Sequence, residues 1–313
     1  MSGAPRREWF NWYPGRAATA RAATLAAKDS VRGRGLWQDA WARLRRNRAA
    51  MLSLIVLSLI TVGCIVLPWV WPYNYATPDW DLLNQAPTLA GGHIFGTDGL
   101  GRDLFARVLW GCRISLMVGV VATLVALLIG VTWGAIAGYA GGWLDGLMMR
   151  TVDVLYSVPF IPFVIILIVL FGRNILLMFA AIGAVSWLDI ARIVRGQTLS
   201  LKQKEFIEAA RAGGVGDVGI IRRHIVPNLI GIVIVYITLT IPSIILFEAF
   251  LSFLGLGVQA PMTSLGGLVS NGAGVLQSYP YQLIIPSIFL AVIVYCFNFI
   301  GDGLRDALDP KDR

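Results

Sequence analysis

Residues 114–144 read ISLMVGVVATLVALLIGVTWGAIAGYAGGWL and contain no charged side chain. A helix crosses the roughly 30 Å hydrocarbon core of a bilayer with about 20 apolar residues, so this run is longer than one crossing needs. Its first part, to about Ala137, predicts a transmembrane helix. The whole chain has the composition of a membrane protein, because it is 57% hydrophobic and only 14% charged.

Five further apolar runs have the length of a membrane crossing. They are residues 51–71, 154–172, 175–194, 229–254 and 281–301. Pro159 and Pro162 stand near the start of the run at 154–172, where the first turn of a helix tolerates proline. Asp189 and Arg192 are predicted to lie in the last turn of the run at 175–194 and to reach the membrane interface. The sequence therefore predicts an all-α membrane protein with six transmembrane helices.

Lysine and arginine are distributed unequally between the connections. Six crossings place both termini on one side, and 22 of the 26 basic residues fall in the segments of that side. Cytoplasmic segments beside membrane helices carry such an excess of positive charge. Both termini are therefore predicted to be cytoplasmic. The net charge of +8 then reflects topology and not binding of nucleic acid.

The segments on the two sides differ in composition. Residues 1–35 predict a mobile basic cytoplasmic extension. Residues 36–50 predict an amphipathic helix lying on the lipid surface before the first span. Outside, residues 72–113 predict an extracytoplasmic loop with a turn at Thr97–Gly99 and a helix from Asp103 into the second span. The other predicted segments are a second, uncharged outer loop without regular structure at 255–280, a core with five spans at 114–303, and a cytoplasmic tail at 304–313.

Few side chains in or near the spans could bind a metal or a substrate. The cysteines lack a CxxC spacing and predict ordinary apolar packing: Cys64, Cys112 and Cys296. His93 stands alone in the outer loop, which does not indicate a metal site. Glu248 is an isolated carboxylate near the outer end of the fifth span. It either lines a substrate pathway or outer gate, or pairs with a donor of an outer loop.

The cytoplasmic connection at 200–228 contains EFIEAARAGGVGDVGIIRRHIVPN from residue 205 onward. Ser200 and Gln203 have the spacing of a capping box and predict a helix from about Leu201 to Ala212. One face of this helix carries an aromatic residue and three small ones: Phe206, Ala209, Ala210 and Gly213. Because so short a helix is marginal in water, a docking partner is predicted.

The glycines after this helix match GxGxxG at 214–219, but they do not predict a nucleotide site. That fingerprint needs a preceding strand and a sheet, whereas here a helix precedes the glycines and a membrane span follows. We interpret the glycines as a helix stop and Asp217 as the cap of a second helix that ends before Pro227. A Walker motif is absent from the chain, which excludes ATP binding by that route.

The same stretch resembles the EAA loop of permeases of ATP-binding-cassette importers. Glu208-Ala209-Ala210, Gly214 and Pro227 stand at the places of that pattern, whereas His224 and Val226 replace its isoleucine and leucine. Other stretches are similar to the C-type permease of oligopeptide importers: FGTDGLGRDLFARVLWGCRISLMVGV, VSWLDIARIVRGQTLSLKQKEFIEAA, RHIVPN, FLSFLGLG and CFNFIGDGLRDALDPKDR. The likeness covers residues 36–313.

The resemblance implies the type I importer permease fold and a multi-pass subunit of the bacterial cytoplasmic (inner) membrane that carries oligopeptides inward. Such a subunit has no catalytic residue, metal or cofactor of its own. The implied partners are a homologous B-type permease, two cytoplasmic ATPase subunits that bind ATP and magnesium, and an extracytoplasmic peptide-binding protein that docks on the outer loops. The residues implied in coupling to an ATPase are Glu205, Phe206, Glu208, Ala209, Ala210, Gly213, Gly214 and Pro227.

Two kinds of alternative stay open. The first is the same type of importer with dipeptide, glutathione or nickel-chelate cargo. The second is a different class of protein, either a stand-alone ion-coupled transporter or a membrane adaptor without transport. The EAA-like loop argues against this second kind, because neither protein needs a docking helix of that pattern.

Overall fold

The computed structural model describes residues 36–89, 92–172 and 174–308. The predicted extension at 1–35 and residues 309–313 of the predicted tail lie outside the described residues. The chain divides into Met1–Asp39 and a compact unit, Ala40–Arg313. The described part is helical apart from loops and one isolated bridge between Thr97 and Asp103, so the predicted all-α class is confirmed.

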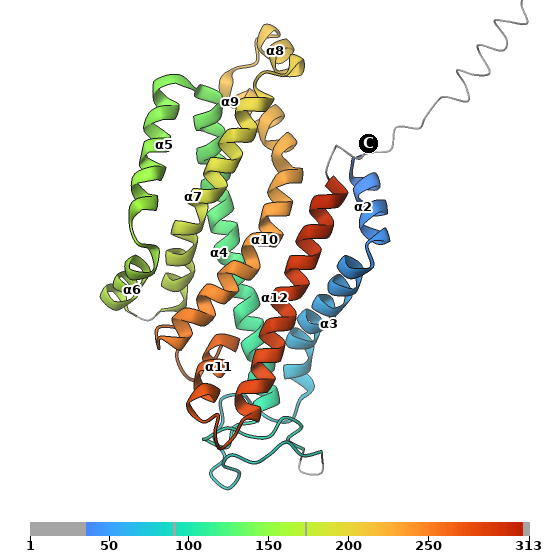
Figure 1. Cartoon of the computed structure of the whole chain (residues 1–313), viewed down its shortest axis with the longest axis vertical. Helices are drawn as coiled ribbons and strands as arrows, with labels where there is room; N and C mark the ends of the chain where they lie inside the picture. The colour runs from blue at the N-terminus through green and yellow to red at the C-terminus, as the bar shows by residue number, and fades with distance from the viewer. Residues whose placement is uncertain (1–35, 90–91, 173, 309–313) are drawn as a thin grey trace, which may run out of the picture. The chain divides into compact units, whose positions relative to one another are not determined.

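The helices follow one another along the chain as Figure 1 shows. They are α2 (Leu36–Arg46), α3 (Arg48–Val70), α4 (Leu104–Ala140), α5 (Gly142–Ser157), α6 (Phe160–Phe171), α7 (Ile175–Leu201), α8 (Glu205–Ala212), α9 (Asp217–Ile220), the π-helical turn η1 (Ile221–Ile225), α10 (Val226–Phe253), α11 (Leu265–Gly274) and α12 (Tyr281–Leu308). Within the unit Ala40–Arg313, α8 and α9 lie at one end, and α11 lies at the other (Figure 1).

Four helical runs of the described residues are long and apolar enough to cross a membrane. They are α3, α4, the continuous run Asp217–Phe253, and α12. Helices α5 and α6 pass the same test only as a pair, with a bend of 80° between them. Helix α7 occupies the place of the fourth predicted span. The total of six crossings and the cytoplasmic side of the termini stay predictions.

The bend between α5 and α6 corrects the third predicted span, which was expected as one helix at 154–172. Residues 154–157 end α5, Pro159 caps α6, and Pro162 lies in its first turn. Val158 is extended, with φ −72° and ψ 127°. A residue before proline is driven out of the helical region by contact with the proline ring, so the helix breaks at this point.

Glycines on one face of α4 set its packing against α7. A Cβ atom added at Gly130 would lie 2.7 Å from the Cβ of Ile190, and one at Gly138 would lie 2.8 Å from the carbonyl oxygen of Arg195. At Gly134 it would collide with the carbonyl oxygen of Ala191. Small residues at a spacing of four let membrane helices approach backbone to backbone. This contact holds α4 and α7 together over the half that leads to α8.

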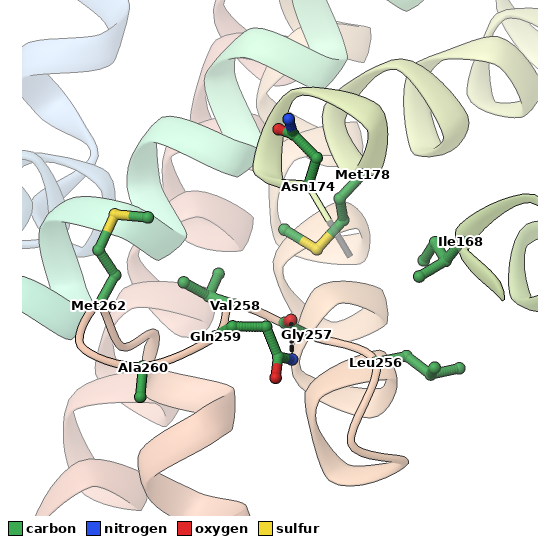
Figure 2. Close-up of a pocket in the computed structure, with 9 residues that line it drawn as sticks. All are labelled: Ile168, Asn174, Met178, Leu256, Gly257, Val258, Gln259, Ala260 and Met262. Atoms are coloured by element: carbon green, nitrogen blue, oxygen red, sulfur yellow. Dashed lines mark hydrogen bonds between the residues drawn. The ribbon is translucent and has the colours of Figure 1, made fainter. Parts of the chain in front are cut away.

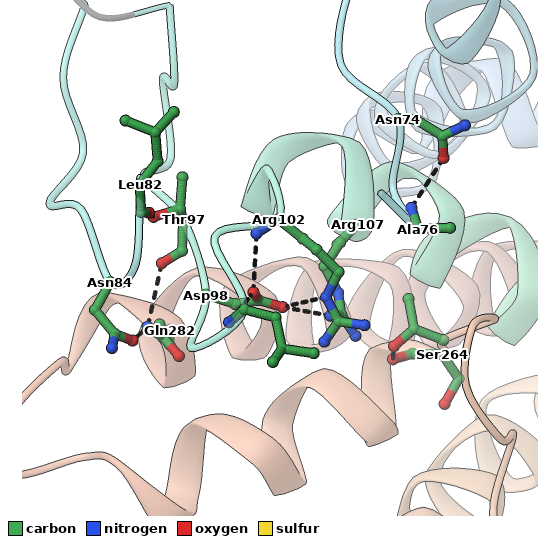
Figure 3. Close-up of polar contacts among 12 residues, drawn as sticks. Asn74, Ala76, Leu82, Asn84, Thr97, Asp98, Arg102, Arg107, Ser264 and Gln282 are labelled. Atoms are coloured by element: carbon green, nitrogen blue, oxygen red, sulfur yellow. Dashed lines mark hydrogen bonds and ion pairs between the residues drawn. The ribbon is translucent and has the colours of Figure 1, made fainter. Parts of the chain in front are cut away.

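The first outer loop folds back on the start of α4 around Asp98 (Figure 3). Its carboxylate accepts hydrogen bonds from the backbone N–H of Leu100 at 2.8 Å and of Arg102 at 3.0 Å. It also pairs with the side chains of Arg102 and Arg107. Asp103 caps α4 by accepting the N–H of Ala106 at 2.7 Å. The predicted turn and the predicted helix from Asp103 into the second span are therefore present.

His93 is not alone, contrary to the prediction. Its Nδ1 lies 2.8 Å from Oδ2 of Asp103, and its ring packs on Tyr73 with 4.2 Å between the ring centroids. Oδ1 of Asp103 accepts the indole N–H of Trp71 at 3.1 Å. His93 thus helps to fix the outer loop on the N-terminus of α4. Across the described ranges, no group of three or more His, Cys, Asp or Glu side chains could hold a metal ion.

The second outer loop contains helix α11, which corrects the prediction of a loop without regular structure. Ser264 caps this helix, because its Oγ accepts the N–H of Gly267 at 3.0 Å. Gly266 packs on the backbone of Ala249 in α10, and Gly272 packs on the backbone of Gln282 in α12. The glycines that suggested an irregular loop instead let a short helix lie directly against its neighbours.

The three cysteines are free thiols buried inside the unit. Cys64 of α3 and Cys112 of α4 lie in an apolar cluster that also contains Ile241, Leu268 and Ile293. Cys296 is buried in α12. The predicted apolar packing is confirmed for Cys64 and Cys112.

Replacing Gly134 by alanine should destabilise the protein. The added methyl group meets the backbone of α7, and overpacking of this kind costs about 1–3 kcal/mol. Gly146 of α5 has nothing within 4 Å of an added Cβ, so Gly146→Ala is the matched control. We expect it to be neutral or slightly stabilising, because alanine favours a helix over glycine. Thermal unfolding of the detergent-purified proteins checks this, and equal midpoints for the two variants would contradict it.

Candidate coupling site beside the ends of α4 and α7

Helix α8 begins later than predicted. Ser200 lies inside the last turn of α7, which continues to Leu201, and Lys204 precedes α8 without a side-chain cap. The predicted capping box with Gln203 is therefore wrong. Thr198 packs against Gly138 and so continues the contact of α7 with α4. This packing keeps α7 helical through Ser200, where the sequence pattern predicted the start of a new helix.

The end of α8 is set by Gly214, as predicted. Its φ of +81° is in the left-handed region, where other residues are strained. The N–H of Gly214 donates to the carbonyl of Arg211 at 3.0 Å, and the N–H of Val215 donates to that of Ala210 at 3.1 Å. This pair of hydrogen bonds is a Schellman motif, which closes the helix and turns the chain toward α9.

The second helix differs from its prediction at both ends. Gly216, not Asp217, occupies the N-cap position, and Asp217 is the first helical residue. The helix does not end before Pro227, because α9, η1 and α10 form one continuous run and Pro227 lies in the first turn of α10. The π-helical turn just before Pro227 has an extra residue, and such turns accommodate a missing backbone donor.

The inner side of α8 is fastened to the unit by Ile207, a residue that the sequence analysis missed. Its side chain is fully buried in a cluster with Tyr139 of α4, Ile220 and Ile225. The same cluster includes Val194 of α7. A single isoleucine among small and charged residues gives only a weak sequence signal. The other cluster members named here come from α4, α7, α9 and η1.

Tyr139 is the second residue that the sequence analysis missed. Its hydroxyl donates to Oδ1 of Asp217 at 2.8 Å and accepts from Nη2 of Arg211 at 3.3 Å. The hydrogen bond to Tyr139 raises the pKa of Arg211 above its ordinary value, so the guanidinium stays charged. The ammonium of Lys202 also lies over the Tyr139 ring, 5.7 Å from its centroid. One side chain at the end of α4 thus holds both sides of the α8–α9 turn.

The predicted coupling residues lie mostly on the exposed face of α8 and of the turn that follows it. Those on α8 and its turn that are exposed are Glu205, Phe206, Glu208, Ala209, Gly213 and Gly214, while Ala210 is half-buried. Phe206 is 42% exposed although it is aromatic. Glu205 and Glu208 form no ion pair within the residues that the structure describes. Pro227 is exposed but belongs to a different element, the start of α10.

Glu248 lies far from α8 and is fully buried. Its carboxylate accepts the hydroxyl of Ser115 in α4 at 3.1 Å and that of Ser252 in α10 at 2.7 Å. Ser252 lies 3.3 Å from the hydroxyl of Ser264, which caps α11. Glu248 therefore joins α4, α10 and the second outer loop, as in the structural interpretation. A role for Glu248 in a pathway or outer gate stays a prediction.

The charged residues of α7 correct another prediction. Asp189 lies 12 residues before the end of α7 and not in its last turn. Arg192 pairs with Asp153 of α5 at 2.7 Å, and Arg195 holds Asp145 of α5 through two hydrogen bonds of 2.6 and 2.7 Å. These ion pairs fasten α5 to α7.

A small cavity of about 140 Å³ lies at the opposite end of α7 (Figure 2). Met178 of α7 and Ile168 of α6 face the segment after α10, which contributes residues 256–260 and Met262 to the lining. The amide of Gln259 turns back and donates to the carbonyl of Gly257 at 2.8 Å. The cavity belongs to the second outer loop and has no contact with the coupling residues.

Comparisons with known proteins agree with this architecture. The family described as "Binding-protein-dependent transport system inner membrane component" matches residues 130–313, and "N-terminal TM domain of oligopeptide transport permease C" matches residues 35–87. The oligopeptide transport system permease protein OppC of Escherichia coli K12 is 58% identical and covers 92% of this chain and 96% of its own. The OppC of Haemophilus influenzae is 56% identical, with 90% and 91% covered.

Among solved structures, a chain of the inward-facing MetNI methionine ABC transporter has the same fold. The TM-score is 0.54 at 19% identity, over 66% of this chain and 96% of that one. At this identity the likeness concerns the fold alone. The chain belongs to the family of binding-protein-dependent transport system inner membrane components, and it is an OppC-type permease of the multi-pass type found in the inner membrane.

Proposed function

We propose that this chain is the permease subunit of an ATP-binding-cassette importer that carries oligopeptides into the cytoplasm. The observation that carries the proposal is the identity of 56–58% with oligopeptide permeases over at least 90% of the chain. Dipeptide, glutathione or nickel-chelate cargo is the remaining alternative. Identification of the compounds bound to the co-purified receptor subunit tests the cargo, and a receptor without peptides would contradict it.

Helix α8 is the proposed contact with a partner ATPase. It presents Phe206, Glu208 and the small residues Ala209 and Gly213 to the outside, so a partner can approach its backbone closely. An exposed phenylalanine on a short helix gains stability when a partner covers it. The free carboxylates Glu205 and Glu208 can form charge-assisted hydrogen bonds in that contact.

The attachment of α8 would let it transmit a movement. A displacement of α8 reaches Ile207 and Tyr139 at once, and through them the packed ends of α4 and α7. Packed cores pass on displacements because they have little free volume. ATP-driven closure of the ATPases would therefore move α4 and α7 together and change access to the pathway between the paired permeases.

The full importer would contain three kinds of partner for this chain. Two ATPase subunits hold ATP and magnesium, a homologous B-type permease completes the pathway, and an extracytoplasmic peptide-binding protein docks on the loops at 72–113 and 255–280. The chain itself then needs no cofactor and no catalytic residue. Co-purification of the assembled complex identifies these partners directly.

Charge reversal on α8 should uncouple transport. We expect Glu208→Lys to leave membrane insertion unchanged and to reduce peptide uptake at least ~10-fold, because it places a like or unpaired charge in the ATPase contact. Asp306→Lys reverses an exposed charge at the end of α12 and serves as the matched control. Uptake and peptide-stimulated ATP hydrolysis of the reconstituted complex are measured. Normal values for Glu208→Lys would rule out the coupling role.

Removal of the Tyr139 hydroxyl should weaken the attachment of the α8–α9 turn to α4. In Tyr139→Phe the ring still packs, but Asp217 and Arg211 lose their shared partner. We expect the amount of peptide imported per ATP hydrolysed to fall about two- to fivefold, since a net hydrogen bond is worth roughly 0.5–1.5 kcal/mol. Tyr295→Phe, at a position 64% exposed, is the control. An unchanged ratio in Tyr139→Phe would show that the hydroxyl is not part of the coupling.

The proposed topology predicts opposite labelling at two exposed positions. A cysteine in place of Val218, 68% exposed beside α8, should react with an impermeant thiol reagent only after the membrane is opened. A cysteine in place of Leu89, 85% exposed in the first outer loop, should react in intact spheroplasts. The native thiols are buried and give a low background. Reaction of the Val218 variant in intact spheroplasts would overturn the orientation.

A further inference from the structure

A second cavity, of about 520 Å³, lies on the faces of α7 and α10, with Phe160 of α6 also in its lining. Most of the lining is apolar, including Ile190 and Phe247. The polar members are Ser186 and Asp189 of α7 and Tyr236, Thr240 and Ser243 of α10. A cavity of this size has the volume of a small-molecule site, and its polar groups all come from predicted membrane helices.

Three of the hydroxyl groups around this cavity, those of Ser186, Thr240 and Ser243, are satisfied by their own helices. Ser186 donates to the carbonyl of Ile182 at 2.9 Å, and Thr240 donates to that of Tyr236 at 2.7 Å. Asp189 is different, because its exposed carboxylate has no ion pair or hydrogen bond within the described part of the chain. Among the residues that the structure describes, it is also the only charged one that lines the cavity.

Asp189 lies within the fourth predicted span and lines the cavity. It lies 12 residues, or about 18 Å, before the end of α7. Ile190 and Ala191 next to it pack on Gly130 and Gly134 of α4, whereas Asp189 lies at the open cavity. Charged side chains within a membrane span face a water-filled cavity or a partner and not hydrocarbon, since lipid offers a carboxylate no hydrogen bonds.

We propose that Asp189 binds the N-terminal ammonium group of a peptide that passes this cavity. The proposal rests on the proposed peptide transport. A single carboxylate on a wide apolar wall is complementary to the one cation that unmodified linear peptides share, whatever their side chains. Asp189 would then be a recognition point inside the permease, separate from the receptor and from α8.

Thiol labelling of the assembled complex tests whether the carboxylate is free. Ser186→Cys, one turn from Asp189, is placed in a complex whose other accessible cysteines are removed, and an aminoethyl thiosulfonate is compared with its neutral methyl analogue. The ratio of the labelling rate of the cationic reagent to that of the neutral reagent is measured with Asp189 present and in the Asp189→Asn background. This ratio should be about fivefold higher with Asp189 present, because the carboxylate attracts the cation. An equal preference in both backgrounds, as a lysine or arginine of a neighbouring subunit would produce, overturns the proposal. If neither reagent reacts with the introduced cysteine, the cavity is covered in the complex, and the proposal is also overturned.

Uptake of trialanine tests the ligand, because the N-terminal ammonium is its only cation. Asp189→Asn keeps the size of the side chain and an acceptor oxygen but loses the charge, and we expect uptake to fall about tenfold. Asp189→Glu should retain most uptake, and Asp306→Asn, which removes an exposed carboxylate at the end of α12, is the control. An unchanged rate in Asp189→Asn, or an equal loss in Asp189→Glu, would sink the proposal.

The same assay separates this inference from the proposed function. Uptake of trialanine by the unmodified complex supports peptide transport whatever the Asp189 variants do. If the unmodified complex moved no peptide with its receptor and ATP present, the proposed function itself would fail, and this inference with it. Peptide-stimulated ATP hydrolysis in Asp189→Asn should remain, since the coupling helix is unchanged.

Discussion

The contact of α4 with α7 through Gly130, Gly134 and Gly138 is the constraint on which the rest of the structure depends. It brings two backbones together, so the side chains on both sides of the pair are directed outward to other elements. On one side α5 is fastened to α7 by ion pairs, and on another α10 packs on α4. A larger residue at any of these glycines would separate the helices and move everything that they position.

The turn between α8 and α9 is built on the same contact. Gly138 is followed directly by Tyr139, so the last close approach of the two helices fixes the ring that holds the α8–α9 turn. Ile207 adds an apolar attachment from the other side of the turn. Helix α8, the proposed coupling helix, is therefore short and exposed but attached at two points. Its Schellman end at Gly214 and the continuous run that follows connect α8 to α10, a predicted membrane helix.

The sequence predicted the features that depend on local pattern. Apolar runs located α3, α4, α10 and α12, and the glycines at 213–214 located the end of α8. Features that depend on tertiary contact were missed. Ser200 was interpreted as a cap, although packing of α7 on α4 keeps it helical. The Gly-rich segment at 255–280 was interpreted as irregular, although its glycines seat α11 against α10. Ile207, Tyr139 and the partner of His93 could not be found, because each acquires its role from residues of other helices or of a folded loop.

The short α5 has a consequence for the surrounding lipid. With 16 residues it is about 24 Å long, whereas the hydrocarbon core of a bilayer is roughly 30 Å thick. The 80° bend into α6 prevents it from continuing straight across. We expect the bilayer beside α5 to thin locally, at a modest elastic cost for each ångström of mismatch. Membrane thickness would then act on the helix that Arg192 and Arg195 tie to α7, so the acyl-chain length of the host lipid becomes one of the forces that set the conformation of this subunit.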